Sequence, residues 1–179
     1  METSPALYEA LGDAQRLGFL GSRPIDQVIE HARGFVNALE STVGSVADLG
    51  AGGGVPGLVI AHDRPDLAVT LIDRRAKRTD FLERIVLRLG WAGRVDIVAA
   101  DVRDVAMTDG ARFDGAVARG FGPPSRTLQL AVRLVRPGGV VVISEPPDGD
   151  RWSDDPSVKT GGVVPDFGTG GVVRFRVER

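Results

Sequence analysis

Short runs of apolar residues alternate along most of the chain with longer segments in which apolar residues recur every three or four positions. The short runs predict buried strands, at residues 46–49, 68–72, 95–99, 113–118 and 140–144. The longer segments predict helices between them, at residues 56–62, 74–89 and 124–135. Because strands that alternate with helices form parallel sheets with helices on both faces, the pattern predicts an α/β fold.

The first part of the chain lacks strand signals and has helical periodicity instead. The pattern is weak over residues 5–20 and clear over residues 24–39. Pro24 suits a first helical turn, which Ser22 can cap. We expect residues 1–44 to form a helical lid on the main fold, within one compact domain.

The last part of the chain predicts a loop and a final strand. Residues 145–155 are rich in Pro, Asp and Gly, which is typical of a loop. Residues 173–177 alternate apolar and charged positions, which predicts a half-buried antiparallel strand at the sheet edge. Residues 45–179 are therefore expected to form the main, ligand-binding part of the domain.

Composition narrows the possible functions. Glycine is unusually common, at 24 of 179 residues, and the net charge of −2 excludes a basic field over the whole molecule for holding nucleic acid. The absence of cysteine excludes zinc–thiolate sites, and His31 and His62 have no ligand-like spacing, so we expect no metal. No apolar run approaches the roughly 20 residues of a membrane span, and no signal peptide is visible, so we expect a cytoplasmic protein.

The strongest motif is a glycine-rich loop after the first predicted strand. Asp48 closes the strand, and glycines follow at alternate positions, Gly50, Gly52 and Gly54. Such a loop brings bare backbone against a ligand where a side chain would clash. Gly52, Gly54 and Gly57 also satisfy the dinucleotide fingerprint G-x-G-x-x-G, but its first glycine normally follows the strand at once. At this level two ligands compete, a dinucleotide and S-adenosylmethionine (SAM).

A second acidic residue follows the second predicted strand. Asp73 lies 23 residues after Gly50, where a carboxylate in a nucleoside-binding βαβ unit can accept hydrogen bonds from both ribose hydroxyls. The alternative is that Asp73 caps the helix that follows, a position in which aspartate is common. The glycine loop favours the ribose interpretation.

Several stretches of the chain resemble one family. The alternate-glycine loop is similar to motif I of class I SAM methyltransferases. The stretches DLGAGGGVPGL, RPDLAVTLIDRRAKRTDFL, FDGAVARGF and RPGG together resemble the RsmG (GidB) family, in order and over roughly half the chain. The resemblance implies a Rossmann-like fold, SAM as cofactor, and methylation of N7 of one guanine in 16S rRNA, with that RNA or the 30S subunit as partner.

The resemblance also implies roles for individual residues. In this family a carboxylate at Asp101 meets the adenine amino group, and the backbone amide of Val102 meets a ring nitrogen. The alternatives are a cap or a solvated loop, with Asp104 as a second candidate. The cofactor-binding residues implied are Asp48, Gly50, Ala51, Gly52, Gly54, Asp73, Arg74, Asp101, Val102 and Arg119.

Arg119 is the candidate for the substrate side and for a catalytic role. It follows the fourth predicted strand, where ligands of open α/β sheets bind, and its planar fork can hold guanine O6 or a phosphate. The alternative is a structural ion pair with Glu145 or Asp114. Phe121 can stack on a base, or it can simply pack under the turn that follows it. Since guanine N7 carries no proton, methyl transfer to it needs positioning and no general base.

Three departures from the family keep other functions open. The segment before the glycine loop is shorter than in typical members, and the C-terminal part is also short. Ser144-Glu145-Pro146-Pro147 replaces a lysine-glycine pair after the fifth strand. The acidic isoelectric point and the lost lysine favour, as a rival, a methyltransferase of small molecules. A catalytically inert SAM-binding module is a second alternative. A nicotinamide-dependent oxidoreductase would need hydride chemistry for which no Tyr-x-x-x-Lys is present.

The predicted helix at residues 74–88 carries a local excess of positive charge. This segment contains six basic and two acidic residues, which gives it a net charge of +4 in a chain whose total is −2. Such a segment can contact RNA phosphates, or it can be an ordinary solvated helix face.

Overall fold

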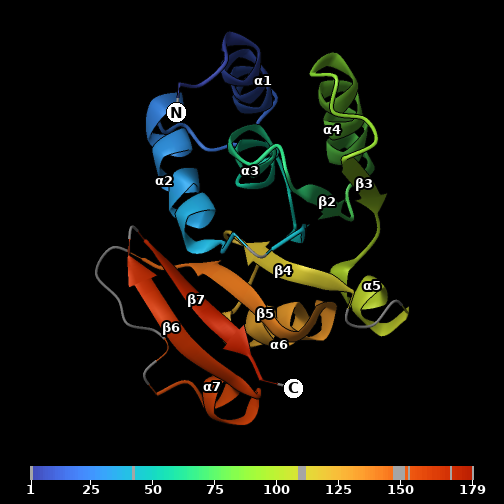
Figure 1. The fold of residues 1–179 in the computed structure, drawn as a ribbon. Coiled ribbons are helices and arrows are strands. Elements are labelled where there is room, and N and C mark those ends of the chain that lie inside the picture. Colours follow the sequence, from blue (N-terminus) through green and yellow to red (C-terminus); the bar gives the residue numbers. More distant parts are fainter. Residues whose placement is uncertain are drawn as a thin grey trace.

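The computed structural model describes residues 2–41, 43–108, 112–146, 152, 154–169 and 171–178. These residues form a seven-stranded sheet in the order β3-β2-β1-β4-β5-β7-β6 (Figure 1). The strands are β1 (Ser45–Leu49), β2 (Ala68–Asp73), β3 (Val95–Ala99), β4 (Phe113–Ala118), β5 (Val135–Ser144), β6 (Val163–Thr169) and β7 (Val172–Val177). Strands β1 to β5 pair in parallel, and β7 and β6 add an antiparallel edge. The predicted fold class is confirmed.

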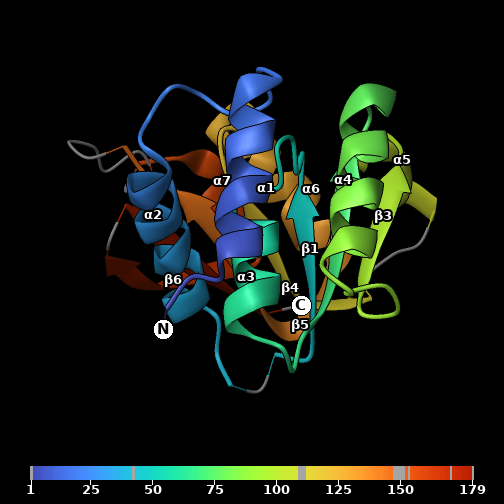
Figure 2. The ribbon, with the colours of Figure 1, turned by 90° about the horizontal axis from the view of Figure 1, so that it is seen from above.

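Helices cover both faces of this sheet. One face carries α1 (Pro5–Arg16), α2 (Ile25–Ala38), α3 (Gly57–Asp63) and α4 (Ala76–Arg88), which lie nearest the viewer in Figure 2. The other face carries α5 (Val102–Thr108), α6 (Pro124–Leu134) and α7 (Pro156–Thr160) (Figure 1). The arrangement has two hydrophobic cores, one on each side of the sheet.

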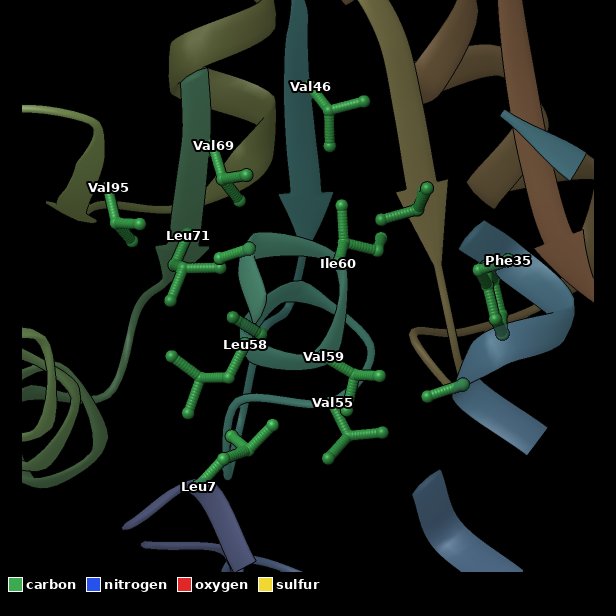
Figure 3. Close-up of a cluster of buried hydrophobic side chains, with 14 of the residues drawn as sticks. Leu7, Phe35, Val46, Val55, Leu58, Val59, Ile60, Val69, Leu71 and Val95 are labelled. Carbon is green, nitrogen blue, oxygen red and sulfur yellow. The ribbon is translucent and has the colours of Figure 1, made fainter. Parts of the chain in front are cut away.

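The strands contribute side chains to both cores, because successive side chains of a strand point to opposite faces of the sheet. In β1, Val46 joins the core under α2 and α3, whereas Ala47 joins the core under α6. Figure 3 shows the first core, in which Leu58 and Ile60 of α3 pack among side chains from the strands. Such burial stabilises the fold by roughly 1.5–3 kcal/mol for each large aliphatic side chain.

The N-terminal helices are part of this first core. Leu7 and Leu11 of α1 and Phe35 of α2 have no exposed surface and belong to the same cluster as the strand side chains (Figure 3). The side chain of Ser4 caps α1 by accepting a hydrogen bond from the Leu7 N–H at 3.3 Å. The prediction that Ser22 caps α2 is wrong, because α2 begins after Pro24 without a side-chain cap.

Three described elements have no counterpart in the sequence prediction. They are the short helices α5 and α7 and the outer strand β6. Strand β7 is antiparallel to β5 as expected, and β6 then pairs with its other side, so the antiparallel edge is two strands wide. Most of the predicted loop at residues 145–155 lies outside the described residues.

Strand β5 begins earlier than predicted because its first residue pairs before a bulge. Val135 pairs with Phe113, and the next pair joins Val140 to Gly115. The residues between Val135 and Val140 therefore bulge out of the ladder, and a Cβ on Gly139 there would collide with the backbone oxygen of Asp114.

Chain direction in the sheet fixes where a ligand can bind. Strands β2 and β3 lie on one side of β1, whereas β4 and β5 lie on the other. The strand order therefore reverses between β1 and β4. Open α/β sheets bind ligands at the carboxyl ends of the strands beside such a switch point. This places the expected site on the loops that follow β1, β2, β3 and β4.

Candidate cofactor and methyl-transfer site

The glycine loop joins β1 to α3 through backbone conformations and contacts that exclude side chains. Gly50 has a φ of 69°, and a Cβ on it would lie 2.6 Å from Cδ2 of Phe121. Gly52 and Gly54 also have positive φ angles. At Gly57 a Cβ would lie 2.6 Å from Oδ2 of Asp48 and would collide with Leu71 of β2. The loop therefore needs glycine both for its turn and for close packing on the strands.

Asp48 is a buried carboxyl beneath this loop, with 1% of its surface exposed. Its Oδ2 accepts a hydrogen bond from the Gly57 N–H at 2.9 Å. Its Oδ1 is buried and has no hydrogen-bond partner among the described residues. Burial raises the pKa of Asp48 to about 7, although the Gly57 N–H and the charge of Arg119 oppose this. One carboxyl oxygen beneath the glycine loop is therefore buried without a hydrogen bond from any described residue.

The buried Asp48 is expected to make stability depend on pH. Because its pKa in the folded protein lies above the ordinary value of about 4, folding favours the protonated form. This contribution is complete below about pH 4 and is lost as the pH rises through about 7. In Asp48→Asn the fall in melting temperature from pH 5 to pH 8 should be smaller by several degrees, corresponding to roughly 2–3 kcal/mol. Thermal unfolding of both proteins across this range is the test, and equal slopes would contradict it.

Asp73 joins the glycine loop to the start of α4. Its Oδ2 accepts a hydrogen bond from the Gly52 N–H at 2.9 Å, and its Oδ1 accepts one from the Arg75 N–H at 2.9 Å. Nη1 of Arg78 lies 3.5 Å from Oδ2. The residue in the cap position of α4 is Arg75, without a side-chain cap bond, so Asp73 does not serve as the N-cap of α4. Its carboxylate instead lines the site at the end of β2.

A cleft of about 540 Å³ lies over the carboxyl ends of these strands. Six of the predicted site residues line it: Gly50, Asp73, Arg74, Asp101, Val102 and Phe121. The other predicted residues, Asp48, Ala51, Gly52, Gly54 and Arg119, are not among its lining residues. Three of the six that line it, Asp73, Asp101 and Val102, are the residues expected at the adenosine end of the cofactor.

Asp101 follows β3 and lies directly before α5. Its carboxylate accepts hydrogen bonds from Nη2 of Arg103 at 2.7 Å and from Nε of Arg103 at 3.0 Å. Arg74 approaches the same carboxylate at 3.8 Å. The hydrogen bonds from Arg103 hold the pKa of Asp101 well below its usual range. Asp101 is therefore ionised at neutral pH and can accept a hydrogen bond from a ligand amine.

Arg119 is not among the residues that line the cleft, and it lies close enough to Asp48 and Arg23 to interact with their charges. It is half-buried, and burial lowers its pKa while the nearby charge of Asp48 raises it. Within the described part of the chain it forms no ion pair within 4 Å, and Asp114, one proposed partner, is paired with Arg136 at 3.1 Å. Burial, Arg119 and then Arg23 lower the pKa of His31 in α2. Arg23 and the imidazole of His31 thus lie near Arg119, a grouping that spacing along the chain does not reveal.

The loop between α1 and α2 covers the glycine loop. A Cβ on Gly53 would lie 2.6 Å from Cγ of Leu20 and 3.0 Å from the backbone oxygen of Phe19. The Phe19 ring packs edge-on against Phe81, with centroids 5.5 Å apart. The side-chain amide of Gln15 donates to the Gly21 oxygen at 2.6 Å and so holds this loop in place. Phe19 and Leu20 could not be identified as site residues from the sequence, because an apolar pair in a loop carries no periodic signal.

This geometry fits SAM. The loop presents bare backbone, the buried Oδ1 of Asp48 lacks a partner, and the cleft carries the ionised Asp101. Among the described residues, no group of three or more histidine or acidic side chains is arranged to hold a metal ion. The described helices include none that is long and apolar enough to cross a membrane. The fold is that of class I SAM-dependent methyltransferases, and the residues of the site fit SAM as a ligand.

Comparison with solved structures supports the fold. An O-methyltransferase family protein from Burkholderia thailandensis has a TM-score of 0.63 and 15% identity, over 86% of this chain and 58% of that one. A SAM-dependent methyltransferase from Thiobacillus denitrificans, solved with S-adenosyl-L-homocysteine, has a TM-score of 0.57 and 24% identity, over 81% of this chain and 56% of that one. At these identities the likeness shows a shared fold.

Comparison with sequence families is more specific. The family described as rRNA small subunit methyltransferase G (GidB) matches residues 24–145, and the chain belongs to this family. The relative from Nocardioides sp. is 42% identical over 58% of this chain and 39% of its own length. The relative from Rubrobacter xylanophilus is 34% identical over 74% of this chain and 53% of its own length. Both are named ribosomal RNA small subunit methyltransferase G, and the chain spans about half the length of such relatives.

Proposed function

We propose that this chain binds SAM and transfers its methyl group to N7 of a guanine in 16S rRNA. The observation that carries the proposal is the glycine loop with Asp73 and Asp101 at three adjacent strand ends, in a chain of the methyltransferase G family. Bound SAM would supply an electrophilic methyl group on a sulfonium. The protein would bind it, orient it and exclude water from it.

The described contacts support a separate role for each residue at the adenosine end of the cofactor. Asp73 has lone pairs left for the ribose hydroxyls after it accepts the Gly52 and Arg75 N–H groups. Asp101 would accept from the adenine amino group, and the Val102 backbone would meet a ring nitrogen. Arg74, beside Asp101, would close the adenosine end.

The methionine end would lie along the glycine loop. Gly50, Ala51, Gly52 and Gly54 would bring bare backbone against it. The unpartnered Oδ1 of Asp48 would face its ammonium group. The loop that carries Phe19 and Leu20 already covers Gly53, which supports a lid role for residues 1–44.

The acceptor side would be formed by the residues that follow β4. Arg119 is half-buried and without an ion pair among the described residues, so its fork can reach guanine O6 or a phosphate. Phe121 lines the cleft and packs on Gly50, close enough to stack on a base. Guanine N7 needs no general base, and the arrangement supplies positioning groups for it.

Methyl-labelled SAM tests this proposal. The protein should be incubated with 30S subunits, with naked 16S rRNA and with a small-molecule extract, using RNA from a strain without its own N7 methyltransferase. We expect label in rRNA at a site that borohydride and aniline cleave, the signature of N7-methylguanine. Label only in the extract would reassign the protein to small molecules. Binding of SAM without any transfer would make it an inert module.

A further inference from the structure

The cleft is lined by more positive charge than its proposed cofactor requires. Five arginines line it, against the two carboxylates of Asp73 and Asp101, which gives a net charge of +3. The whole chain carries a net charge of −2. The arginines come from three places in the fold, the start of α4, the start of α5 and the first turn of α6. They are Arg74, Arg75, Arg78, Arg103 and Arg126.

Three of these arginines are already engaged with the two carboxylates. Arg103 binds Asp101 at 2.7 Å, with Arg74 at 3.8 Å from the same side chain, and Arg78 lies 3.5 Å from Asp73. Arg75 and Arg126 are exposed and form no ion pair within the described part of the chain. They border the cleft from helices on opposite faces of the sheet, α4 and α6 (Figure 1).

The cofactor does not account for these two cations. SAM has no phosphate, and its sulfonium and ammonium groups outnumber its carboxylate, so added positive charge around its site disfavours its binding. Retaining Arg75 and Arg126 at the rim therefore costs cofactor affinity, unless a second, anionic ligand lies across the opening. An RNA backbone carries a phosphate at each nucleotide and matches two cations set on opposite sides of a cleft.

We propose that Arg75 and Arg126 bind backbone phosphates of the RNA segment whose guanine enters the site. This inference rests on the proposed function, because it requires an RNA acceptor. It assigns RNA contact to the rim of the cleft and not to the whole basic helix. Further along α4, Arg88 is paired instead with Asp13 of α1 at 3.2 Å.

The chain offers a matched control on the same two helices. Arg84 of α4 and Arg133 of α6 are also exposed, but they do not line the cleft. The double variant Arg75→Gln/Arg126→Gln should be compared with Arg84→Gln/Arg133→Gln. Each double variant loses one positive charge from α4 or its N-cap and one from α6. A difference between them reports the position of the charges and not their number.

The measurement is binding of a 16S rRNA transcript between 50 and 200 mM KCl. Each phosphate contact to single-stranded RNA contributes about 0.7 to the slope of log K against log salt. We expect the rim variant to lose about 1.4 from this slope, and to bind RNA roughly tenfold more weakly at 100 mM KCl. The control should keep the wild-type slope, and SAM affinity by calorimetry should not fall in either variant.

The outcomes separate this inference from the proposed function. Wild-type protein that methylates rRNA, with equal slopes in the two double variants, would overturn the rim contact alone. Wild-type protein that neither binds nor methylates RNA would overturn both proposals. A third outcome is that guanosine monophosphate displaces the transcript and binds with the same affinity as the RNA. The rim would then hold a single phosphate, and the proposed contact with the RNA backbone would be overturned.

Discussion

Asp73→Ala is expected to weaken SAM binding tenfold or more. The wild-type carboxylate would form charge-assisted hydrogen bonds with the ribose hydroxyls, each of which contributes roughly 1.5–3 kcal/mol. The same carboxylate accepts the N–H groups of Gly52 and Arg75, so its loss also loosens the loop that receives the methionine end. Calorimetric titration with SAM measures the combined effect.

A control separates cofactor binding from folding in this experiment. Asp80→Ala removes an exposed carboxylate from α4 and changes the net charge equally, and it should leave SAM affinity unaltered. Asp73→Asn keeps one acceptor oxygen for a backbone N–H and should lose less affinity than the alanine variant. If Asp73→Ala folds with a near-native melting temperature and binds SAM as well as wild type, Asp73 does not belong to the site.

The parallel part of the sheet could be predicted from the sequence because its central strands, β1 and β4, are buried on both faces. A strand such as β4 is apolar at every position except Asp114, and this produces a short run that glycine and proline delimit. Helices α4 and α6 carry apolar stripes at helical spacing for the same reason. Helix α7 has five residues and α5 has seven, too few for a repeating stripe, and both were missed.

The cofactor side of the site was also predictable, because its residues lie next to strand ends in the sequence. Gly50 and Asp101 each follow a strand within two residues, and Asp73 is the last residue of β2; parallel strands bring such positions to one edge. This logic identifies neighbours of the strands but not the direction of their side chains. It placed Arg119 beside Phe121, whereas the structure places Phe121 in the cleft and Arg119 outside it.

The remaining site residues depend on packing between distant segments. His31 of α2 lies against Gly171, 140 positions further along the chain, with a Cβ on that glycine 3.2 Å from Cε1 of the imidazole. Arg126 reaches the cleft from α6, and Leu20 reaches the glycine loop from the N-terminal region. These contacts require the positions of the helices on the sheet, which no local pattern contains.

Arg119→Ala should lower the rate of methyl transfer to rRNA tenfold or more while SAM affinity changes little. Arg119 lies outside the cleft that holds the proposed adenosine contacts, and its guanidinium has no ion pair among the described residues. Its planar fork is therefore available to the acceptor base or its phosphate. Single-turnover methylation with saturating SAM and varied RNA measures the loss, and calorimetry measures SAM binding in parallel.

Arg119→Lys provides the matched control, because it keeps the charge but loses the fork. If the fork orients the acceptor, lysine should restore little of the rate. If only the charge acts, lysine should restore most of the rate.

The charge of Arg119 can also be measured through stability, since the proximity of Arg119 lowers the pKa of Asp48. Arg119→Ala should therefore move the pH dependence of stability that Asp48 causes to higher pH, and Arg119→Lys should not. Unchanged turnover in the alanine variant, together with this shift, would leave Arg119 an electrostatic partner of Asp48 and remove it from the acceptor site.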